Sequence, residues 1–385
     1  MHPEMFTVKC SIIRGGTSKG VYIMANELPA DAIKRDNYIR EIFGSPDLRQ
    51  IDGLGGADVL TSKVCIIGPS SRPDADVDYI FAQVSFADEV IDYKSNCGNL
   101  SAGVGPFAVD NGLVAAVEPV TTVRIHQVNT DSIIVASFPV TGGRAKVTGD
   151  EHIDGVPVDG ASVELDFSDS AGGITGKLLP TGNVTDEIIT GDGKSYTITM
   201  LDAGIPTVFA LASDLGMTGI ETPAEIEGNT VLMDKIEEIR SRCAVIMGIL
   251  DDWNSGRAKS SYTPFFACVS PSVDYVTFDG KQVAGSEIDL VSRLVFMQRM
   301  HKTHPVTGTI CMGAAARVPG SIVNRVLSEK GKNNRRLVIG HPAGVIPVVS
   351  EMEEQNGQFI LKNASILRTA RLIMEGQVYL RYTRV

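Results

Sequence analysis

The chain has 385 residues, of which 43% are hydrophobic, and a formal net charge of −11 at pH 7. One hydrophobic core rarely supports this length, so two domains are expected. The acidic balance argues against nucleic acid as a partner, because phosphate binding requires a basic surface. The apolar runs fall well short of about 20 residues, so no membrane-spanning helix is expected.

The cysteines also restrict the class of protein. The N-terminal residues lack the charged and then apolar build of a signal peptide. Six cysteines are scattered singly, with no CxxC pair and no Cys/His cluster, so neither a zinc site nor a disulfide framework is predicted. Reduced thiols in a cytoplasmic protein fit this pattern best, and the residues show no spacing typical of metal ligands.

The first predicted strand, Phe6 to Ile13, leads into a glycine-rich turn with the sequence RGGTSKG at residues 14–20. This turn combines backbone N–H groups, hydroxyl groups and cations, although it lacks the spacing of a P-loop. It therefore supplies four candidate substrate-binding residues, Gly16, Thr17, Ser18 and Lys19. The alternative is a tight turn whose glycines serve only the backbone shape.

The next elements are predicted from capping residues and short apolar runs. A helix is expected over residues 30–43, beginning near Asp31. Lys63 stands at the start of a strand that continues to Ile67, where it is either a functional group or an ordinary surface lysine. Further strands are predicted near residues 77–86, 121–128, 132–139 and 162–167.

The stretch from Ser95 to Gly112, SNCGNLSAGVGPFAVDNG, is predicted to be a polar turn followed by a buried helix. Cys97 would then lie at the helix N-terminus, where free N–H groups and the helix dipole favour anions and the thiolate. Asn96, Gly98 and Asn99 in the same turn are candidate substrate-binding residues. Pro106 suggests a kink or a later helix start. The alternative is a buried helix with a structural cysteine.

A short internal repeat in the sequence indicates two similar halves. Residues 20–28, GVYIMANEL, resemble residues 207–215, TVFALASDL, and both segments follow a glycine-containing turn. A Gly/Thr-rich stretch, residues 168–183, lies between the halves. The predicted domains are therefore residues 1–183 and residues 184–385.

The second half repeats the turn-and-helix pattern. A long amphipathic helix is predicted from Glu287 to Lys302, followed by the polar turn HPVTG at residues 304–308 and a small apolar run. His304, Thr307 and Gly308 are candidate carboxylate-binding residues, or ordinary helix-capping residues. Two such helix N-termini facing one cleft would suit a ligand with two or more carboxylates.

These motifs together resemble one protein family. The matching segments are RGGTSKG (14–20), LTSK (60–63), NCGNLSAGVGPFA (96–108), HPVTG (304–308), PGSIVN (319–324), GHPAG (340–344) and RTARLIMEG (368–376). In order and spacing this set is similar to the PrpF family. The resemblance implies an α+β chain with two similar domains of the diaminopimelate-epimerase-like fold. Each domain would be a mostly antiparallel β-sheet or barrel around a central apolar helix, with the active-site cleft between the domains.

The resemblance also implies an activity. Family members isomerise unsaturated di- and tricarboxylates, as methylitaconate Δ-isomerase, 2-methylaconitate isomerase or 4-oxalomesaconate tautomerase. Residues 43–63 and 73–84 resemble the methylitaconate Δ-isomerases most. The acid/base lysine and cysteine of the family correspond to Lys63 and Cys97. The implied reaction is a 1,3-proton shift through a dienolate, which requires no cofactor and no metal.

Two departures from related patterns matter. Diaminopimelate epimerases carry a second cysteine at the turn that here reads HPVTG, and its absence argues against an amino-acid racemase or epimerase. Ile205 stands where the family usually has an asparagine, which suggests a less polar end of the substrate. A non-catalytic carboxylate-binding accessory protein of a dehydratase is the alternative of another class. The sequence leaves open whether the chain forms a homo-oligomer.

Overall fold

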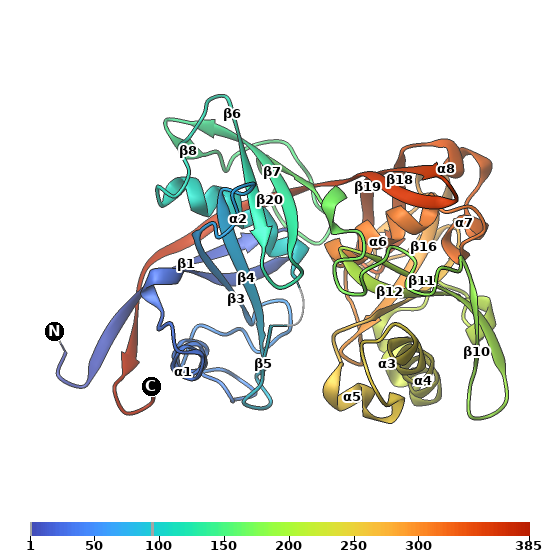
Figure 1. The fold of residues 1–385 in the computed structure, drawn as a ribbon, viewed down its shortest axis with the longest axis horizontal. Helices are drawn as coiled ribbons and strands as arrows, with labels where there is room; N and C mark the ends of the chain where they lie inside the picture. Colours follow the sequence, from blue (N-terminus) through green and yellow to red (C-terminus); the bar gives the residue numbers. More distant parts are fainter. Residues whose placement is uncertain (1, 94–95) are drawn as a thin grey trace. The chain divides into compact units, whose positions relative to one another are not determined.

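Strands dominate the fold, as the many short apolar runs predict. The structure is a computed structural model that describes residues 2–93 and 96–385, and it divides into two compact units (Figure 1). Unit 1 consists of Met1–Leu165 and Leu367–Val385, and unit 2 consists of Asp166–Ile366.

Unit 1 is a strand-rich unit with one peripheral and one central helix. Its helices are α1 (Ala32–Phe43) and α2 (Gly98–Asp110). Its strands are β1 (Met5–Gly15), β2 (Ser18–Met24), β3 (Lys63–Pro69), β4 (Val77–Val84), β5 (Ile91–Asp92), β6 (Val120–Gln127), β7 (Ser132–Thr141), β8 (Arg144–Ala145) and β9 (Ser162–Asp166). The predicted strands are confirmed to within about two residues at each end.

Unit 2 has the same plan with more helices. Its helices are α3 (Pro223–Gly228), α4 (Thr230–Ile246), α5 (Gly256–Lys259), α6 (Val306–Ala316), α7 (Ile322–Val326) and α8 (Glu329–Asn333). Its strands are β10 (Asp186–Ile189), β11 (Ser195–Ala203), β12 (Ile205–Leu211), β13 (Phe265–Pro271), β14 (Tyr275–Val276), β15 (Gln282–Val283), β16 (Leu290–Phe296), β17 (Arg299–Met300), β18 (Arg336–His341) and β19 (Gly344–Gln355).

Strand pairing shows that the two units repeat one topology. In unit 1, β1–β2 is antiparallel, β2–β3 parallel, β3–β4 antiparallel, β4–β6 parallel and β6–β7 antiparallel. In unit 2, the pairs β11–β12, β12–β13, β13–β16, β16–β18 and β18–β19 follow the same sequence of directions. The similar segments at residues 20–28 and 207–215 correspond to β2 and β12, each followed by one 3₁₀ turn. Two similar domains are thereby confirmed.

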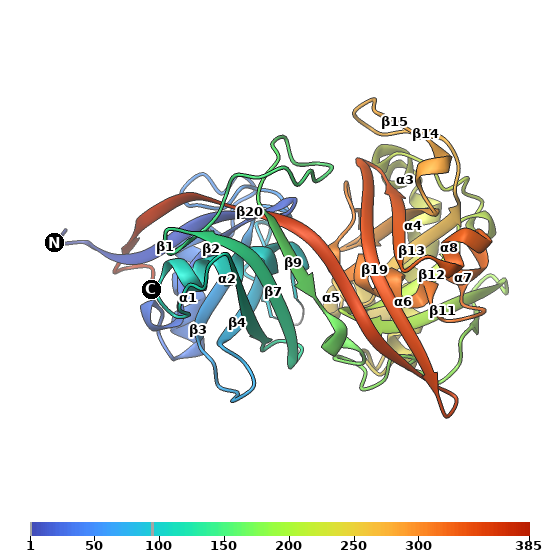
Figure 2. The same cartoon turned by 90° about the horizontal axis from the view of Figure 1, so that it is seen from above.

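One long strand, β20 (Gln358–Arg381), belongs to both units. Its first half pairs with β19, beside which it runs in Figure 2, and its second half pairs with β1 from Ala370 to Arg381. Because of this second pairing, residues 367–385 belong to unit 1, and residues 166–183 join unit 2. The compact units therefore differ from the expected division at residue 183, since sequence order alone does not reveal the return of the last strand.

A buried central helix organises each unit. In α2 every residue from Gly98 to Gly105 is buried, and all of α6 is buried. Small residues allow the sheet to approach closely: a Cβ on Gly103 would lie 2.5 Å from Tyr22 Oη. Figure 1 shows α2 among the strands of unit 1. Tyr22 Oη also donates a 2.5 Å hydrogen bond to the Leu100 carbonyl, which fixes the helix against the sheet.

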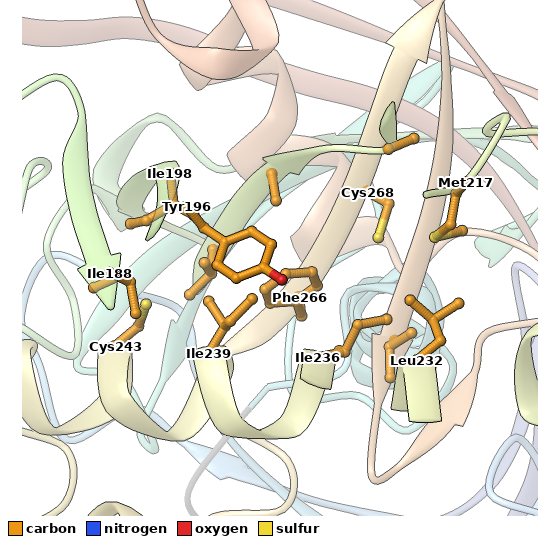
Figure 3. Packing of buried hydrophobic residues seen from close by; sticks show 14 of the residues in the cluster. Ile188, Tyr196, Ile198, Met217, Leu232, Ile236, Ile239, Cys243, Phe266 and Cys268 are labelled. Carbon is orange, nitrogen blue, oxygen red and sulfur yellow. The ribbon is translucent and has the colours of Figure 1, made fainter. Parts of the chain in front are cut away.

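The helix α4 contributes to a cluster of buried apolar residues in unit 2. One of its faces presents buried apolar residues at positions 232, 236, 239 and 243 to strands β11 and β13 (Figure 3). Its amphipathic pattern, with apolar residues three or four positions apart, is the signal that would have predicted this helix.

The prediction of a long helix from Glu287 to Lys302 is wrong. The structure has strand β16 over Leu290–Phe296 and the short strand β17 after it. Every residue of β16 is buried, because β13 and β18 flank it in the sheet. A short run that is buried on both faces has no alternation, so its apolar spacing is easily mistaken for that of a helix.

The helix boundaries of unit 1 agree with the predictions in one case and differ in another. Helix α1 begins after Asp31, whose side chain accepts a hydrogen bond from the Lys34 N–H. Helix α2 begins at Gly98 and continues through Pro106, so the expectation of a later start is wrong. Among the described helices, none is long and apolar enough to cross a membrane.

The hydrogen bond between Tyr22 and α2 can be tested by Tyr22→Phe. Loss of the hydroxyl should lower the free energy of unfolding by about 1 kcal/mol, because a buried carbonyl loses a donor. Urea unfolding measures this change. Tyr379→Phe is the control, since this side chain is 60% exposed on β20 and should change stability little. Equal stabilities of the two variants would contradict the assigned role of Tyr22.

Candidate functional site

The side chains of one face of the unit 1 sheet point towards α2. A Cβ on Gly20 would lie 2.7 Å from Leu100 Cδ1, and Tyr22 bonds the Leu100 carbonyl. Because strand residues alternate between faces, Ser18 shares this face with Gly20 and Tyr22. The N-terminal end of α2 therefore lies over the start of β2.

Strand β3 adds Lys63 to the same face. Val64 pairs with Val21, and both belong to the core on the opposite side of the sheet. Lys63 and Cys65 consequently face α2. The antiparallel partner of Lys63 is Gln83 on β4.

Lys63 is buried and held by neutral groups. Its Nζ donates a 2.7 Å hydrogen bond to Gln83 Oε1 and lies 5.2 Å from the centre of the Phe81 ring. Gln83 Nε2 donates to the Ser62 carbonyl at 2.9 Å, which fixes the orientation of the amide. The amide and the ring orient the ammonium group without neutralising it, so a negatively charged ligand can still pair with it.

Cys97 is the N-cap residue of α2, and its side chain makes no capping hydrogen bond. The N–H and Oγ of Ser101 both donate to the Cys97 carbonyl, at 3.0 and 3.2 Å. The N–H groups of Gly98, Asn99 and Leu100 precede this first helical bond and have no partner within the helix. They form a partly positive end that suits a carboxylate or an enolate oxygen.

Cys97 and Lys63 approach one common neighbour, Cys65. Burial raises the pKa of the Cys65 thiol, the nearby Cys97 raises it further, and the attraction of Lys63 lowers it by less. Burial also raises the pKa of Tyr22 and Tyr79, and both phenols are affected by Cys65 and Cys97. These three groups stay neutral near neutral pH, so they line the site without adding negative charge.

The glycine-rich turn packs against the first residues of α2. A Cβ on Gly15 would lie 2.4 Å from the Asn99 carbonyl oxygen, and one on Gly16 would lie 2.2 Å from Asn99 Oδ1. Gly16 also has a φ of +48°, in the left-handed region that favours glycine. Asn99 Nδ2 donates to Thr17 Oγ1 at 3.1 Å. The two glycines therefore permit a contact that no larger residue would allow.

Most of the site residues predicted in unit 1 lie close together, and one of them does not. Gly16, Thr17, Ser18, Lys63, Cys97, Gly98 and Asn99 gather near the N-terminus of α2, and the buried Asn96 accepts a 3.4 Å bond from Ser101 Oγ. Ser95, the first residue of the predicted turn, lies outside the described residues. Lys19 follows Ser18 in β2, so its side chain emerges on the opposite face and does not join the group.

The corresponding turn of unit 2, HPVTG at residues 304–308, has different side chains. His304 Nδ1 lies 2.7 Å from Thr309 Oγ1, and its Nε2 lies 3.1 Å from Ser292 Oγ. Both ring nitrogens thus contact hydroxyl groups inside unit 2, and a carboxylate-binding role for His304 stays a prediction. The buried Thr307 and Gly308 lie in the first turn of α6, where their N–H groups precede the first helical bond, Thr309 N–H to the Pro305 carbonyl.

One further residue lies near this turn. Ile205 is buried at the start of β12, after Gly204, where a Cβ would lie 3.2 Å from the Thr307 carbonyl. Ile205 is therefore close to the first turn of α6.

Sequence reasoning missed Gln83, although a lone glutamine at an inward position of the apolar strand VDYIFAQV is a recognisable signal. Within residues 2–93 and 96–385, His, Cys, Asp and Glu side chains form no group of three placed to hold a metal ion.

The chain is similar in sequence to proteins named as isomerases. The family profile described as "PrpF protein" matches residues 5–381. The 3-methylitaconate isomerase of Eubacterium barkeri is 51% identical over 383 residues, which cover 99% of each chain. The 2-methyl-aconitate isomerase of Cupriavidus necator is 39% identical over 390 residues, covering 98% of each chain.

Two solved structures are similar to this chain in fold. A crystal structure of methylitaconate-delta-isomerase has a TM-score of 0.84 with 51% identity, and the match covers 99% of this chain and 97% of the other. A hydroxyproline epimerase from Agrobacterium vitis has a TM-score of 0.54 with 12% identity, over 98% of this chain and 93% of the other. The second likeness concerns the fold alone, and it confirms the diaminopimelate-epimerase-like architecture.

The environment of Cys97 predicts selective alkylation. Cys97 is 7% exposed, whereas the other five cysteines are at most 4% exposed. Burial raises the pKa of each of those five thiols, Cys10, Cys65, Cys243, Cys268 and Cys311. Iodoacetamide should therefore modify Cys97 first, because access and thiolate fraction control alkylation. Peptide mass spectrometry after brief treatment measures this, and earlier labelling of another cysteine would contradict the assigned site.

Proposed function

Because the chain belongs to the PrpF family, we propose that it is an isomerase that moves a carbon–carbon double bond within a small unsaturated di- or tricarboxylate. The reaction is a 1,3-proton shift that needs no cofactor. The observation that carries the proposal is the placement of the buried Lys63 and of Cys97, the N-cap residue of α2, on one face of the unit 1 sheet, where both influence the Cys65 thiol.

We further propose 3-methylitaconate as the substrate and dimethylmaleate as the product. The similarity to the Eubacterium barkeri enzyme supports this choice. The buried Ile205, in place of a polar residue, suits a methyl-bearing substrate better than a third carboxylate. 2-Methylaconitate and 4-oxalomesaconate are the alternative substrates within the family.

The chemistry requires a base, an acid and a stabilised anion. The base removes the C–H proton that is both allylic and adjacent to a carboxylate, and the electron pair spreads over the allylic carbons and the carboxylate as a dienolate. The acid then delivers a proton to the terminal methylene carbon, which becomes a methyl group. Cys97 and Lys63 take these two roles, as groups of ordinary acid–base catalysis.

Stabilisation of the dienolate is the second requirement. The N–H groups of Gly98, Asn99 and Leu100 are fixed by the helix and aimed at the space beyond its N-terminus. Such preorganised donors stabilise charge that develops on oxygen. Asn96, Gly16, Thr17 and Ser18 complete the proposed binding site in unit 1, and Thr307 and Gly308 are proposed to bind carboxylate in unit 2.

Proton exchange distinguishes this enzyme from a carboxylate-binding accessory protein. The purified chain should incorporate deuterium into 3-methylitaconate in D₂O and form dimethylmaleate, as followed by NMR. 2-Methylaconitate and 4-oxalomesaconate, tested separately, rank the alternatives. Binding of all three acids without exchange or isomerisation of any would contradict the proposed function.

Cys97→Ser tests the role of the thiol. The variant should fold normally, because serine is nearly isosteric and caps helices well. Turnover should fall about 10²- to 10⁴-fold, since the hydroxyl is far less acidic than a thiol. Cys10→Ser is the control, because Cys10 lies in the core on the other side of the sheet. Turnover of Cys97→Ser near that of the control would remove Cys97 from the mechanism.

A further inference from the structure

Unit 1 contains a buried guanidinium group. Arg368 on β20 is 2% exposed. Its Nη1 donates to the Leu367 carbonyl at 2.8 Å, while its Nε has no hydrogen-bond partner among the residues that the structure describes. Across the described residues, Arg368 forms no ion pair. Burial lowers the pKa of Arg368 to about 9, although the attraction of Glu151 raises it, so the group remains cationic at neutral pH.

The register of the sheet places this cation beside the candidate site. Ala370 pairs with Gly15, which faces Asn99 on α2. Arg368 lies two residues before Ala370 on the same strand and therefore shares that face. A direct contact confirms the placement, since a Cβ on Gly16 would lie 3.0 Å from Arg368 Cδ.

A second unpartnered polar atom lies on the same face. Ser18 pairs with Gly15, so Ser18 and Ala370 lie on either side of this glycine across three adjacent strands. Ser18 Oγ is buried and, within the described part of the chain, has no hydrogen-bond partner. Buried donors and buried charges are costly unless a partner satisfies them. A cation and a hydroxyl, both unsatisfied and on one face, together match an anionic oxygen ligand.

We propose that Arg368, with Ser18, binds one carboxylate of the substrate. This inference rests on the proposed isomerase function and makes Arg368 a substrate-binding residue rather than a proton-transfer group. The guanidinium presents paired donors that suit a carboxylate better than a single ammonium does. The competing explanation is that Arg368 only braces the Leu367 carbonyl within the strand.

The two explanations differ in what Arg368→Gln changes. Loss of a charged hydrogen-bonding partner should raise KM for 3-methylitaconate about 10- to 100-fold, with a smaller effect on kcat. The melting temperature of the ligand-free variant should equal or exceed that of the wild type, because an uncompensated buried charge is removed. Arg371→Gln, at an exposed position on the same strand, is the matched control and should leave both quantities unchanged.

Binding is measured separately from turnover with methylsuccinate, a saturated dicarboxylate that cannot isomerise. Calorimetry should show binding to the wild type and to Arg371→Gln, and binding at least tenfold weaker to Arg368→Gln. Unchanged KM and unchanged methylsuccinate affinity in Arg368→Gln would overturn the inference while leaving the isomerase function intact. A wild type that binds methylsuccinate but isomerises none of the three acids would instead contradict the proposed function, and the affinity of the variant would still decide the role of Arg368.

Arg368→Lys keeps the inference falsifiable if the glutamine variant does not fold. Lysine keeps the charge but loses the planar pair of donors. KM and the dissociation constant of methylsuccinate should then rise at least threefold at an unchanged melting temperature. Wild-type values in this variant, or a wild type that binds no methylsuccinate, would overturn the inference.

Discussion

The buried N-terminus of α2 is the constraint on which the site depends. A helix enclosed by its own sheet cannot direct its first N–H groups to bulk water, and the N-cap side chain of Cys97 does not satisfy them. The surrounding side chains supply Lys63 and Arg368, and among the described residues no carboxylate pairs with either. The proposed carboxylate substrate would satisfy the N–H groups and both cations together.

The same architecture in unit 2 lacks these features. The N-cap of α6 is Pro305, and His304 contacts Ser292 and Thr309 instead of presenting a free imidazole. The two units therefore have similar central helices, and the N-terminus of the one in unit 1 has Cys97 as its N-cap and the buried Lys63 on the sheet face beside it. This asymmetry fits a proton shift along one substrate, whereas an amino-acid epimerase would require an acid/base group at each helix.

Much of this arrangement is predictable from sequence. The glycine-rich turn, the apolar helix after Cys97 and the repeat of residues 20–28 at 207–215 are local patterns, and the structure confirms the helix and the repeat. The face on which Lys19 lies is less predictable, because a turn shifted by one residue exchanges the two faces of a strand. Lys63–Gln83 and Gly16–Arg368 join residues 20 and 352 positions apart, and only the strand register brings them together.

In the proposed mechanism one dicarboxylate lies at the N-terminus of α2, between Cys97 and Lys63. A crystal structure with methylsuccinate bound would locate this ligand. One carboxylate oxygen is expected within hydrogen-bond distance of the N–H groups of residues 98–100. Cys97 Sγ and Lys63 Nζ are both expected within about 4 Å of the ligand's carbon chain. A ligand bound elsewhere in the chain, or one that contacts neither side chain, would contradict this mechanism.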